Sequence, residues 1–326
     1  MLRGRGLTRA RMNLTSIVAT TLGLVSAGLW LHLMAAPAQS PPPAPVPPAN
    51  LRVQGGGNPT TPANAAWNRT NGPKLDLAGY SLVWSDEFDS RRILAGNESG
   101  PALWFAGAQG GPYGAASVGY APRDDVYLVS NGILTIRARA NVDANGARTG
   151  TWYSGHLQAV NTKGEGFALE QGYFEARMKF PSSMGAWPAF WLKHRAKWLN
   201  PASTNVEVDI VEWYGGDWLG HHHTIHLGEG ATRKFWGDYE KTPEDLSREW
   251  HTHGALITDE WIIIYLDQVE IARFPMLDEL RTPLYPQLTL SILKQPETGA
   301  VSPDAMSPMD LLVDYVRVYA PAGTRR

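Results

Sequence analysis

The chain has 326 residues, a formal net charge of −2 and charged side chains at only 18% of its positions. This composition gives no basic surface for nucleic acid, and the absence of cysteine excludes disulfides and thiolate chemistry. The length suffices for one large domain with a substantial core. The 33 glycines and 24 prolines indicate many turns, and the 13 tryptophans fit either a sandwich core or a carbohydrate groove.

The first 38 residues have the pattern of a targeting segment. Four arginines lie within residues 3–11, and residues 14–36 then run without a formal charge to an Ala-Pro-Ala sequence at 36–38. This pattern predicts a cleaved signal peptide, or an uncleaved signal anchor because the apolar run is long enough to span a bilayer. Either reading predicts a secreted or periplasmic domain, or one anchored to the outer side of the cytoplasmic membrane.

A linker is expected next. Residues 40–48 are mostly proline, and residues 39–74 as a whole are polar and rich in Asn, Gly, Pro and Thr, which favours disorder. We expect one folded domain over 75–321 and a short tail at 322–326. No internal repeat or second domain is apparent.

Short strand signals recur through the domain, at 80–84, 126–129, 133–138, 173–180, 261–274 and 313–319. Ser130-Asn131-Gly132 predicts a hairpin turn, and the strand pair in 261–274 is expected to turn near Asp267-Gln268. One or two helical turns are expected at 243–248. Many short strands and few helical signals predict an all-β sandwich or barrel.

The most informative segment is Glu207-Val208-Asp209-Ile210-Val211-Glu212. Its β-branched residues favour a strand, on which Glu207 and Asp209 point to one face. A β-bulge around Ile210-Val211 would return Glu212 to that face. Three acids on one surface raise at least one pKa by repulsion, which suits an enzyme that needs a neutral acid beside an ionised carboxylate. The alternative is a strand with one solvated face.

The flanking sequence narrows this choice. The blocks that accompany the acids are Leu-Val-Trp-Ser-Asp-Glu-Phe at 82–88, Gly-Tyr-Phe-Glu-Ala-Arg-Met-Lys-Phe-Pro at 172–181, Gly-Ala-Trp-Pro-Ala-Phe-Trp-Leu at 185–192 and Val-Asp-Tyr-Val-Arg-Val-Tyr at 313–319. In this order and spacing the chain resembles glycoside hydrolase family 16. Its acid motif has the bulged form typical of the laminarinase-like and galactan-active members.

The resemblance implies a β-jelly roll, a concanavalin A-like sandwich of two curved antiparallel sheets with a concave substrate cleft. It implies endo-acting, retaining cleavage of internal β-linkages in a polysaccharide, a β-glucan above all. By position Glu207 matches the nucleophile, Glu212 the acid/base and Asp209 the acid between them. Catalysis of this kind requires no cofactor.

Four further residues are candidates for substrate binding. Trp187 and Trp191 are four apart on an expected strand, so they share a face and can stack on sugar rings; the alternative is a place in the core. The family often has a substrate-contacting histidine where this chain has His226, which could instead be structural. Arg177 lies on the polar face of its strand, either in the groove or in solvent.

Other aromatic residues near the motif are assigned more simply. Trp213 follows Glu212 and should point into the core, whereas Tyr214, Trp218 and Trp236 are expected near the edge of the cleft. Three consecutive histidines at 221–223 alternate faces on a strand, so they cannot converge on one metal ion.

A structural calcium is the metal that the resemblance implies. Family members often bind one on the convex side, and the matching positions are Glu87, Gly132 and Asp314, whose oxygens would suit a hard cation. Asp314 could equally be satisfied by backbone amides.

Two alternatives to hydrolysis remain open. A transglycosylase would use the same nucleophile and pass the glycosyl unit to another sugar, and a carbohydrate-binding module would use the same sandwich without catalysis. The expected partner is a polysaccharide and the expected state is a monomer, with membrane contact only through an N-terminal anchor. Two departures bear on the substrate: 106–124, with Tyr113 and Tyr120, has no assignable pattern, and 285–294 lacks the Asn-x-Ala-x-Gly-Gly-like ending of many laminarinases.

Overall fold

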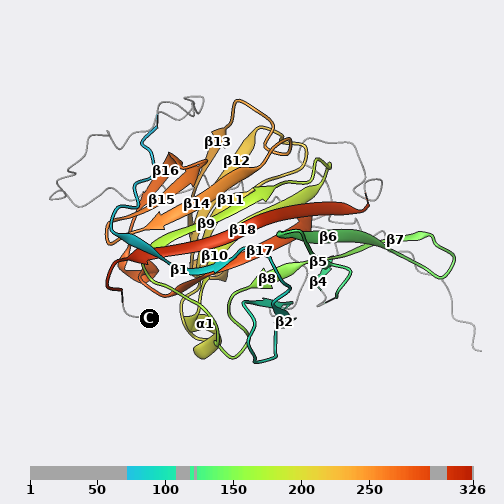
Figure 1. Cartoon of the computed structure of the whole chain (residues 1–326), viewed down its shortest axis with the longest axis horizontal. Coiled ribbons are helices and arrows are strands. Elements are labelled where there is room, and N and C mark those ends of the chain that lie inside the picture. Colours follow the sequence, from blue (N-terminus) through green and yellow to red (C-terminus); the bar gives the residue numbers. More distant parts are fainter. Residues whose placement is uncertain (1–71, 108–117, 121–122, 294–306, 325–326) are drawn as a thin grey trace, which may run out of the picture. The chain divides into compact units, whose positions relative to one another are not determined.

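The computed structural model describes residues 72–107, 118–120, 123–293 and 307–324 (Figure 1). The expected targeting segment, nearly all of the expected linker and Tyr113 lie outside these ranges. Within them, no helix is both long enough and apolar enough to cross a membrane.

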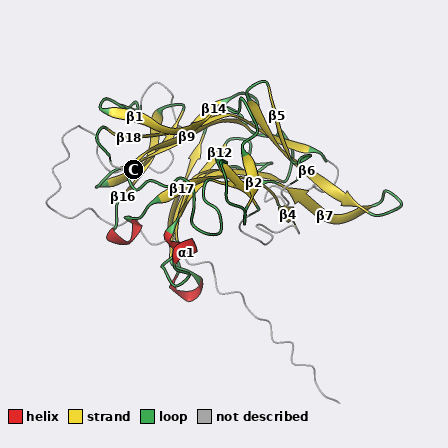
Figure 2. Cartoon of the chain, turned by 60° about the horizontal axis from the view of Figure 1, so that its bottom comes forward, coloured by secondary structure: helices red, strands yellow, loops and turns green. Residues whose placement is uncertain are grey.

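Two β-sheets pack against each other (Figure 2). The ten-stranded sheet runs in the order β16 (Val269–Pro275), β15 (Trp261–Leu266), β14 (His251–Ile257), β9 (Gly172–Lys179), β18 (Met309–Pro321), β6 (Ile133–Val142), β7 (Arg148–Ser154) and β4 (Val118–Tyr120), with β1 (Tyr80–Asp86) on β18 and β5 (Tyr127–Ser130) on β6. The eight-stranded sheet runs in the order β13 (Lys234–Lys241), β12 (Gly220–Leu227), β11 (Val206–Glu212), β10 (Ala186–His194), β17 (Leu284–Ile292), β8 (His156–Gln158), β3 (Trp104–Ala106) and β2 (Ile93–Ala95). The all-β sandwich is therefore confirmed.

Two details differ from the expected pattern. The pairs β2–β3 and β4–β7 are parallel, whereas the other strand pairs are antiparallel. Helical structure is limited in the described residues to α1 (Ala196–Leu199) and the 3₁₀ turns η1 (Gly230–Thr232) and η2 (Asp278–Leu280). The helix expected at 243–248 is wrong: Asp245 Oδ1 accepts hydrogen bonds from the backbone N–H and the hydroxyl of Ser247, a local turn that competes with helical bonding.

Both expected hairpin turns are present. Asn131 and Gly132 have φ of 53° and 72° between β5 and β6, the positive values that an Asn-Gly hairpin turn requires. Asp267 and Gln268 have φ of 49° and 63° between β15 and β16. The Asp267 carboxylate accepts the Thr252 N–H at 2.9 Å, which holds this non-glycine turn against its neighbour.

The core lies between the sheets and follows the alternation of their strands. Phe174, Ala176 and Met178 of β9 are buried from one side, and Val208 of β11 is buried from the other. Trp213 is fully buried in this core, as expected, with its ring 5.4 Å from that of Phe180. The core fixes which face of β11 remains for the site, because alternation turns the neighbours of a buried strand residue outward except at a bulge.

Candidate active site

A β-bulge in β11 gathers the three acids on one face. Across the β10 pairing Trp191 opposes Asp209 and Phe190 opposes Val211, so Ile210 is the extra residue. The pairing with β12 shifts in the same interval. Val208, Ile210 and Val211 are all fully buried in the core, while the three acids line a cleft on the opposite face. The bulge predicted from the spacing is confirmed.

The cleft has a volume of about 440 Å³ and is built on five strands and two loops of the eight-stranded sheet. Its lining combines aromatic rings with acids, hydroxyls and one arginine: Trp187, Ala189, Trp191, Glu207, Asp209, Glu212, Tyr214, Thr224, His226, Arg233, Phe235, Thr289 and Ser291. Open aromatic surface beside polar groups is suited to binding a sugar chain.

Glu207 pairs with a cation that the sequence analysis did not consider. Lys193 lies directly across from Glu207 on β10, and its Nζ donates to Glu207 Oε2 at 2.6 Å. The lysine side chain is 13% exposed and the glutamate side chain 23%. The two side chains are thus in direct contact and only partly hydrated, which strengthens their attraction.

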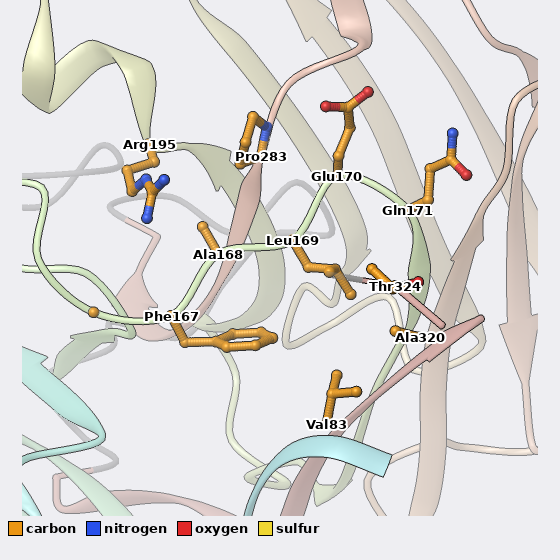
Figure 3. A pocket seen from close by; sticks show the side chains of 11 residues that line it. Val83, Phe167, Ala168, Leu169, Glu170, Gln171, Arg195, Pro283, Ala320 and Thr324 are labelled. Atoms are coloured by element: carbon orange, nitrogen blue, oxygen red, sulfur yellow. The ribbon is translucent and has the colours of Figure 1, made fainter. Parts of the chain in front are cut away.

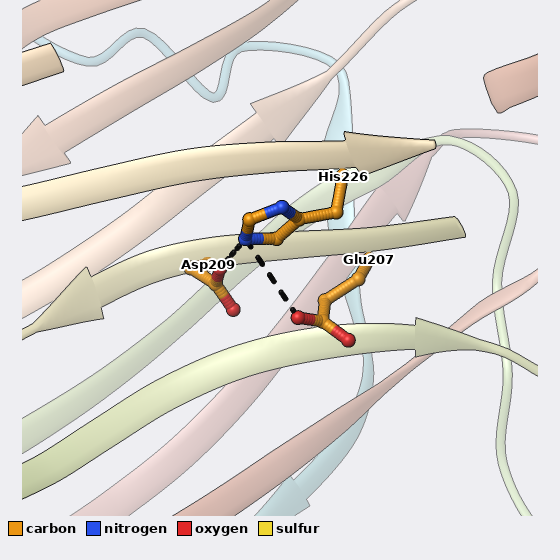
Figure 4. A group of neighbouring side chains, drawn as sticks. All are labelled: Glu207, Asp209 and His226. Carbon is orange, nitrogen blue, oxygen red and sulfur yellow. Dashed lines mark ion pairs between the residues drawn. The ribbon is translucent and has the colours of Figure 1, made fainter. Parts of the chain in front are cut away.

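His226 connects Glu207 to Asp209. Its Nε2 lies 3.0 Å from Asp209 Oδ2 and 3.8 Å from Glu207 Oε1 (Figure 4). Its Nδ1 lies 2.9 Å from Nη2 of Arg233, which can only donate. Nδ1 must therefore accept, and the proton of the neutral ring sits on Nε2, facing the acids. Burial is the main cause that lowers the pKa of His226, which favours this neutral form.

Asp209 and Glu212 are held toward their neutral forms. Burial first, and then the charge of Glu207, raise the pKa of Asp209 well above its ordinary value. Burial and the charge of Asp209 raise the pKa of Glu212 to about 8. Trp187 opposes this rise, because its Nε1 donates to Glu212 Oε1 at 3.0 Å. The site thus places Glu212, which keeps its proton through neutral pH, beside Glu207 in its ion pair with Lys193. Two carboxyl groups in unlike environments are what retaining glycoside hydrolysis requires.

Glu207, Asp209 and His226 each offer one atom within 4.8 Å of the others, which is close enough for a metal ion. Two cations already contact this group: Lys193 binds Glu207 and Arg233 binds His226. Their positive charge opposes the binding of a further cation at the same atoms.

Two of the predicted tryptophans line the cleft. Trp191 is largely buried in its floor, and its Nε1 donates to Thr289 Oγ1 at 2.5 Å. Trp187 is partly exposed, and its ring centre lies 5.5 Å from that of Tyr214, which also lines the cleft.

Trp218 and Trp236 do not line the cleft, contrary to expectation. Trp236 is 9% exposed on β13 and belongs to the core. Trp218 packs against the core with its ring 5.5 Å from that of Trp213. Both indoles are large apolar groups next to a buried partner, so burial outweighs a place at the edge.

Arg177 is on the other sheet, where β9 pairs with β14 and β18. Its Nη1 donates to Asp314 Oδ2 at 2.5 Å, and its guanidinium lies 5.2 Å from the ring centre of Trp250. The structure therefore does not bring Arg177 to the three acids of the cleft. The expectation that Arg177 contacts substrate there is wrong. The sequence showed the polar face of its strand but not which sheet the strand joins.

Two of the three positions expected for calcium carry carboxylates that are bound by arginines. A Cβ on Gly132 would lie 3.7 Å from the carbonyl oxygen of Glu87, so these two residues are neighbours. The Glu87 carboxylate receives two N–H groups of Arg317, at 3.0 and 2.8 Å, and that of Asp314 is bound by Arg177. A divalent ion would compete with these two guanidinium groups for the carboxylate oxygens.

The consecutive histidines alternate faces, as predicted. His221 and His223 are fully buried, and His221 Nε2 lies 3.2 Å from Nδ1 of His253 on the facing sheet. His222 points the other way, with its Nε2 3.0 Å from Asp217 Oδ2.

The sequence analysis missed several cleft residues. Thr289 and Ser291 lie on β17, where Gln, Thr and Ser alternate with Leu, Leu and Ile at 287–292. This alternation is a signal for a strand with one polar face. Lys193 and Arg233 had no such signal, because their importance lies in the side chains that they contact, Glu207 and His226.

A second hollow of about 490 Å³ lies elsewhere in the domain, lined mainly by apolar residues that include Val83, Phe167 and Leu169 (Figure 3). Among its described lining residues the charged ones are Glu170 and Arg195. It lacks the paired carboxylates that glycosidic bond cleavage needs.

Comparison with known proteins agrees with this site. The model of the glycosyl hydrolases family 16 matches residues 144–299, which include all three acids. The endo-1,3-1,4-β-glycanase ExsH of Rhizobium meliloti is 29% identical over 262 residues, covering 76% of this chain and 53% of that protein. A β-glucanase of Rhodothermus marinus is also 29% identical, covering 74% of this chain and 85% of that protein. The chain thus spans about half the length of the Rhizobium relative.

Solved structures show the same fold. A mutant of SCLam, a non-specific endo-β-1,3(4)-glucanase co-crystallised with a glucan oligosaccharide, has a TM-score of 0.62 at 25% identity, covering 77% of this chain and 98% of that one. The catalytic domain of a laminarinase from Thermotoga petrophila has a TM-score of 0.58 at 23% identity, covering 75% of this chain and 99% of that one. The matched region, the sandwich and the bulged acid strand all agree in their similarity to glycoside hydrolase family 16, and to its laminarinase-like endo-β-glucanases in particular.

Proposed function

We propose that the protein is an endo-acting, retaining glycoside hydrolase that cleaves internal β-linkages of a polysaccharide with a β-glucan backbone. The observation that carries this proposal is the pairing of two unlike glutamates on one open cleft. Glu207 is bound by Lys193 at 2.6 Å, whereas the pKa of Glu212 is raised to about 8. One carboxylate is thus ready to attack while the other still holds a proton.

The reaction follows from these two states. A carboxylate oxygen of Glu207 attacks the anomeric carbon as the glycosidic bond breaks, and the proton of Glu212 passes to the departing oxygen. The glycosyl ester on Glu207 is then attacked by water, whose proton returns to Glu212 as the ester bond breaks. Two displacements at one carbon retain its configuration.

His226 and Asp209 hold the nucleophile in place. The Nε2–H of His226 faces Asp209 at 3.0 Å and Glu207 at 3.8 Å, and Arg233 fixes the tautomer from the other side of the ring. A neutral Asp209 spares Glu207 a second negative charge at close range, which matters because repulsion between carboxylates would favour protonation of the nucleophile.

The relatives support a β-glucan backbone. The Rhodothermus relative and SCLam are β-glucanases by name, and the Rhizobium relative is an endo-1,3-1,4-β-glycanase by name. Transfer to a sugar instead of water would use the same residues, and the lengths of the products distinguish the two reactions.

The test is a reducing-sugar assay on laminarin and mixed-linkage glucan with the wild type and with Glu207→Gln and Glu212→Gln. We expect each variant to stay folded by circular dichroism and to lose at least a thousandfold in kcat. Glu260→Gln changes an exposed acid on a turn of the ten-stranded sheet and serves as the matched control. Full activity of either cleft variant would reject the assignment.

We also propose export, on the strength of residues 1–38 alone. Fractionation of cells that make the full chain should place the domain outside the cytoplasmic membrane, and its recovery only from the cytosol would contradict this.

A further inference from the structure

Two cations flank the nucleophile within a single row across the eight-stranded sheet. Phe235 of β13 opposes His226 of β12, His226 opposes Glu207 of β11, and Glu207 opposes Lys193 of β10. Arg233 is close to Phe235 in sequence, and its guanidinium lies 5.6 Å from that ring and 2.9 Å from the His226 ring nitrogen. Lysine and arginine therefore stand on the two sides of Glu207.

The charges around this row do not balance. Three acids line the cleft in the described part of the chain, and Asp209 and Glu212 are held toward their neutral forms. Burial lowers the pKa of His226, which favours its neutral ring. Glu207 therefore lies between two cations, in an ion pair with Lys193 and with Arg233 on the far side of His226.

Arg233 is the cation that Glu207 does not pair with. Its side chain is exposed and lines the cleft, and among the described residues it has no carboxylate partner. Arginine presents a planar set of N–H donors that matches carboxylate and sulfate oxygens. A histidine ring nitrogen uses one of these donors, which leaves others for a ligand.

The reaction itself moves the negative charge away from Lys193. When Glu207 becomes a glycosyl ester it loses its charge, and the Lys193 ammonium then loses its ion-pair partner. The negative charge moves to Glu212, whose described hydrogen-bond partner is Trp187. An anionic group on the bound sugar would replace the lost partner of Lys193 at this step.

We propose that the cleft selects an acidic polysaccharide, whose carboxylate or sulfate substituent on the glycosyl unit at Glu207 is bound by Arg233 and Lys193. This inference rests on the proposed function and adds the substrate class. It predicts that the protein prefers a β-glucan backbone carrying acidic groups over the same backbone without them.

The matched substrates are laminarin and mixed-linkage glucan, each unmodified, carboxymethylated and sulfated. We expect kcat/KM for at least one acidic form to exceed that of its neutral parent by about tenfold or more, as charge-assisted hydrogen bonds allow. The comparison of carboxymethylated with sulfated polymer identifies the favoured anion. The preference should shrink in 0.5 M NaCl, because salt screens these charges.

Two variants test whether Arg233 and Lys193 cause the preference for acidic polymers. Arg233→Gln and Lys193→Met should each reduce the ratio of acidic to neutral kcat/KM by about tenfold. Arg248→Gln removes a charge from a side chain that is 78% exposed and outside the cleft, so it should leave the ratio unchanged. If both variants lose activity equally on every polymer, the two cations only position Glu207 and His226, and the inference is overturned.

A binding measurement separates this inference from the proposed function. The Glu212→Gln protein should bind carboxymethylated laminarin oligosaccharides about tenfold more tightly than neutral ones by calorimetry, and Arg233→Gln in that background should abolish the difference. Equal binding overturns the substrate class even if hydrolysis of neutral glucan is confirmed. If instead Glu207→Gln cleaves any of these polymers at the wild-type rate, the proposed function fails, and the inference fails with it.

Discussion

The indole Nε1 of Trp187 donates a hydrogen bond to Glu212 Oε1 over 3.0 Å. A ring that is positioned to stack on a sugar therefore also binds the acid/base. The bond stabilises the charged form of Glu212, whereas burial and the charge of Asp209 favour the neutral form and prevail. Trp187 thus limits how far the pKa of Glu212 rises.

The raised pKa of Glu212 predicts an alkaline limit to activity. Glycosylation needs the protonated acid, and a carboxyl with a pKa of about 8 keeps its proton through neutral pH and loses it above that value. We expect kcat/KM to fall about tenfold per pH unit above pH 8, measured on a soluble β-glucan. A decline that began near pH 5 would show that Glu212 is not the proton donor.

Replacement of Trp187 by Phe should move this limit upward. The variant keeps an aromatic ring but removes the hydrogen bond that favours ionised Glu212, so the pKa of Glu212 should rise. A hydrogen bond to a charged group contributes about 1.5–3 kcal/mol, which corresponds to a shift of about one to two pH units.

Trp191→Phe is the matched control for this experiment, because the Trp191 indole donates to Thr289 and not to an acid. It should weaken substrate binding without moving the alkaline limb. Identical pH profiles for wild type and Trp187→Phe would contradict the role of this bond.

Deletion of Ile210 should destabilise the domain. The bulge places both Ile210 and Val211 in the core. Without the extra residue the strand reads Glu-Val-Asp-Val-Glu, in which regular alternation keeps the three acids on one face. The deletion nevertheless removes a fully buried side chain and shifts the pairing with β10 and β12, so we expect a loss of several kcal/mol in the free energy of unfolding by urea titration.

Ile210→Val keeps the bulge and is the control for that deletion. It should cost about 0.5–1.5 kcal/mol and leave turnover near the wild-type level. A deletion protein as stable as the wild type would contradict the prediction.

The buried histidines should make the domain sensitive to acid. Burial is the main cause that lowers the pKa of His223 and of His253 to about 3, and it also lowers that of His221. In the unfolded chain their pKa is about 6.5, so between pH 6.5 and 3 the unfolded state binds more protons. Stability is then fully present above pH 6.5 and falls as pH decreases, by about 1.4 kcal/mol per pH unit for each histidine.

Urea titrations at pH 7.5, 5.5 and 4.5 measure this effect. His223→Leu should reduce the dependence on pH, whereas His222→Gln, on the opposite face of the same strand, should retain it. A stability that does not change from pH 7.5 to 4.5 would contradict the prediction.

Calcium removal should leave the domain unchanged. The carboxylates of Glu87 and Asp314 are bound by Arg317 and Arg177, so their charge is neutralised without a metal ion. We expect the Tm with excess EDTA and with 5 mM CaCl₂ to agree within about 2 °C. A rise of 5 °C or more with calcium would show that a cation displaces these ion pairs.

The local sequence pattern was sufficient to predict the fold class and to place the three acids on one face. Alternation assigned the faces of β9 and β12, and the extra residue between Asp209 and Glu212 predicted the bulge, because the side-chain period of a strand is two. The turns at Asn131-Gly132 and Asp267-Gln268 follow from residues at those positions alone.

Only the tertiary structure decided which charges meet. Lys193 lies 14 residues from Glu207 in the chain, and Arg177 lies 137 residues from Asp314. Such pairs depend on which strands are neighbours and in what register, and these follow from how the two sheets bury their apolar faces together. The sequence by itself determined the strand pattern and the three acids with their bulge, and the packing of the sheets placed Lys193 against Glu207 and Arg233 against His226.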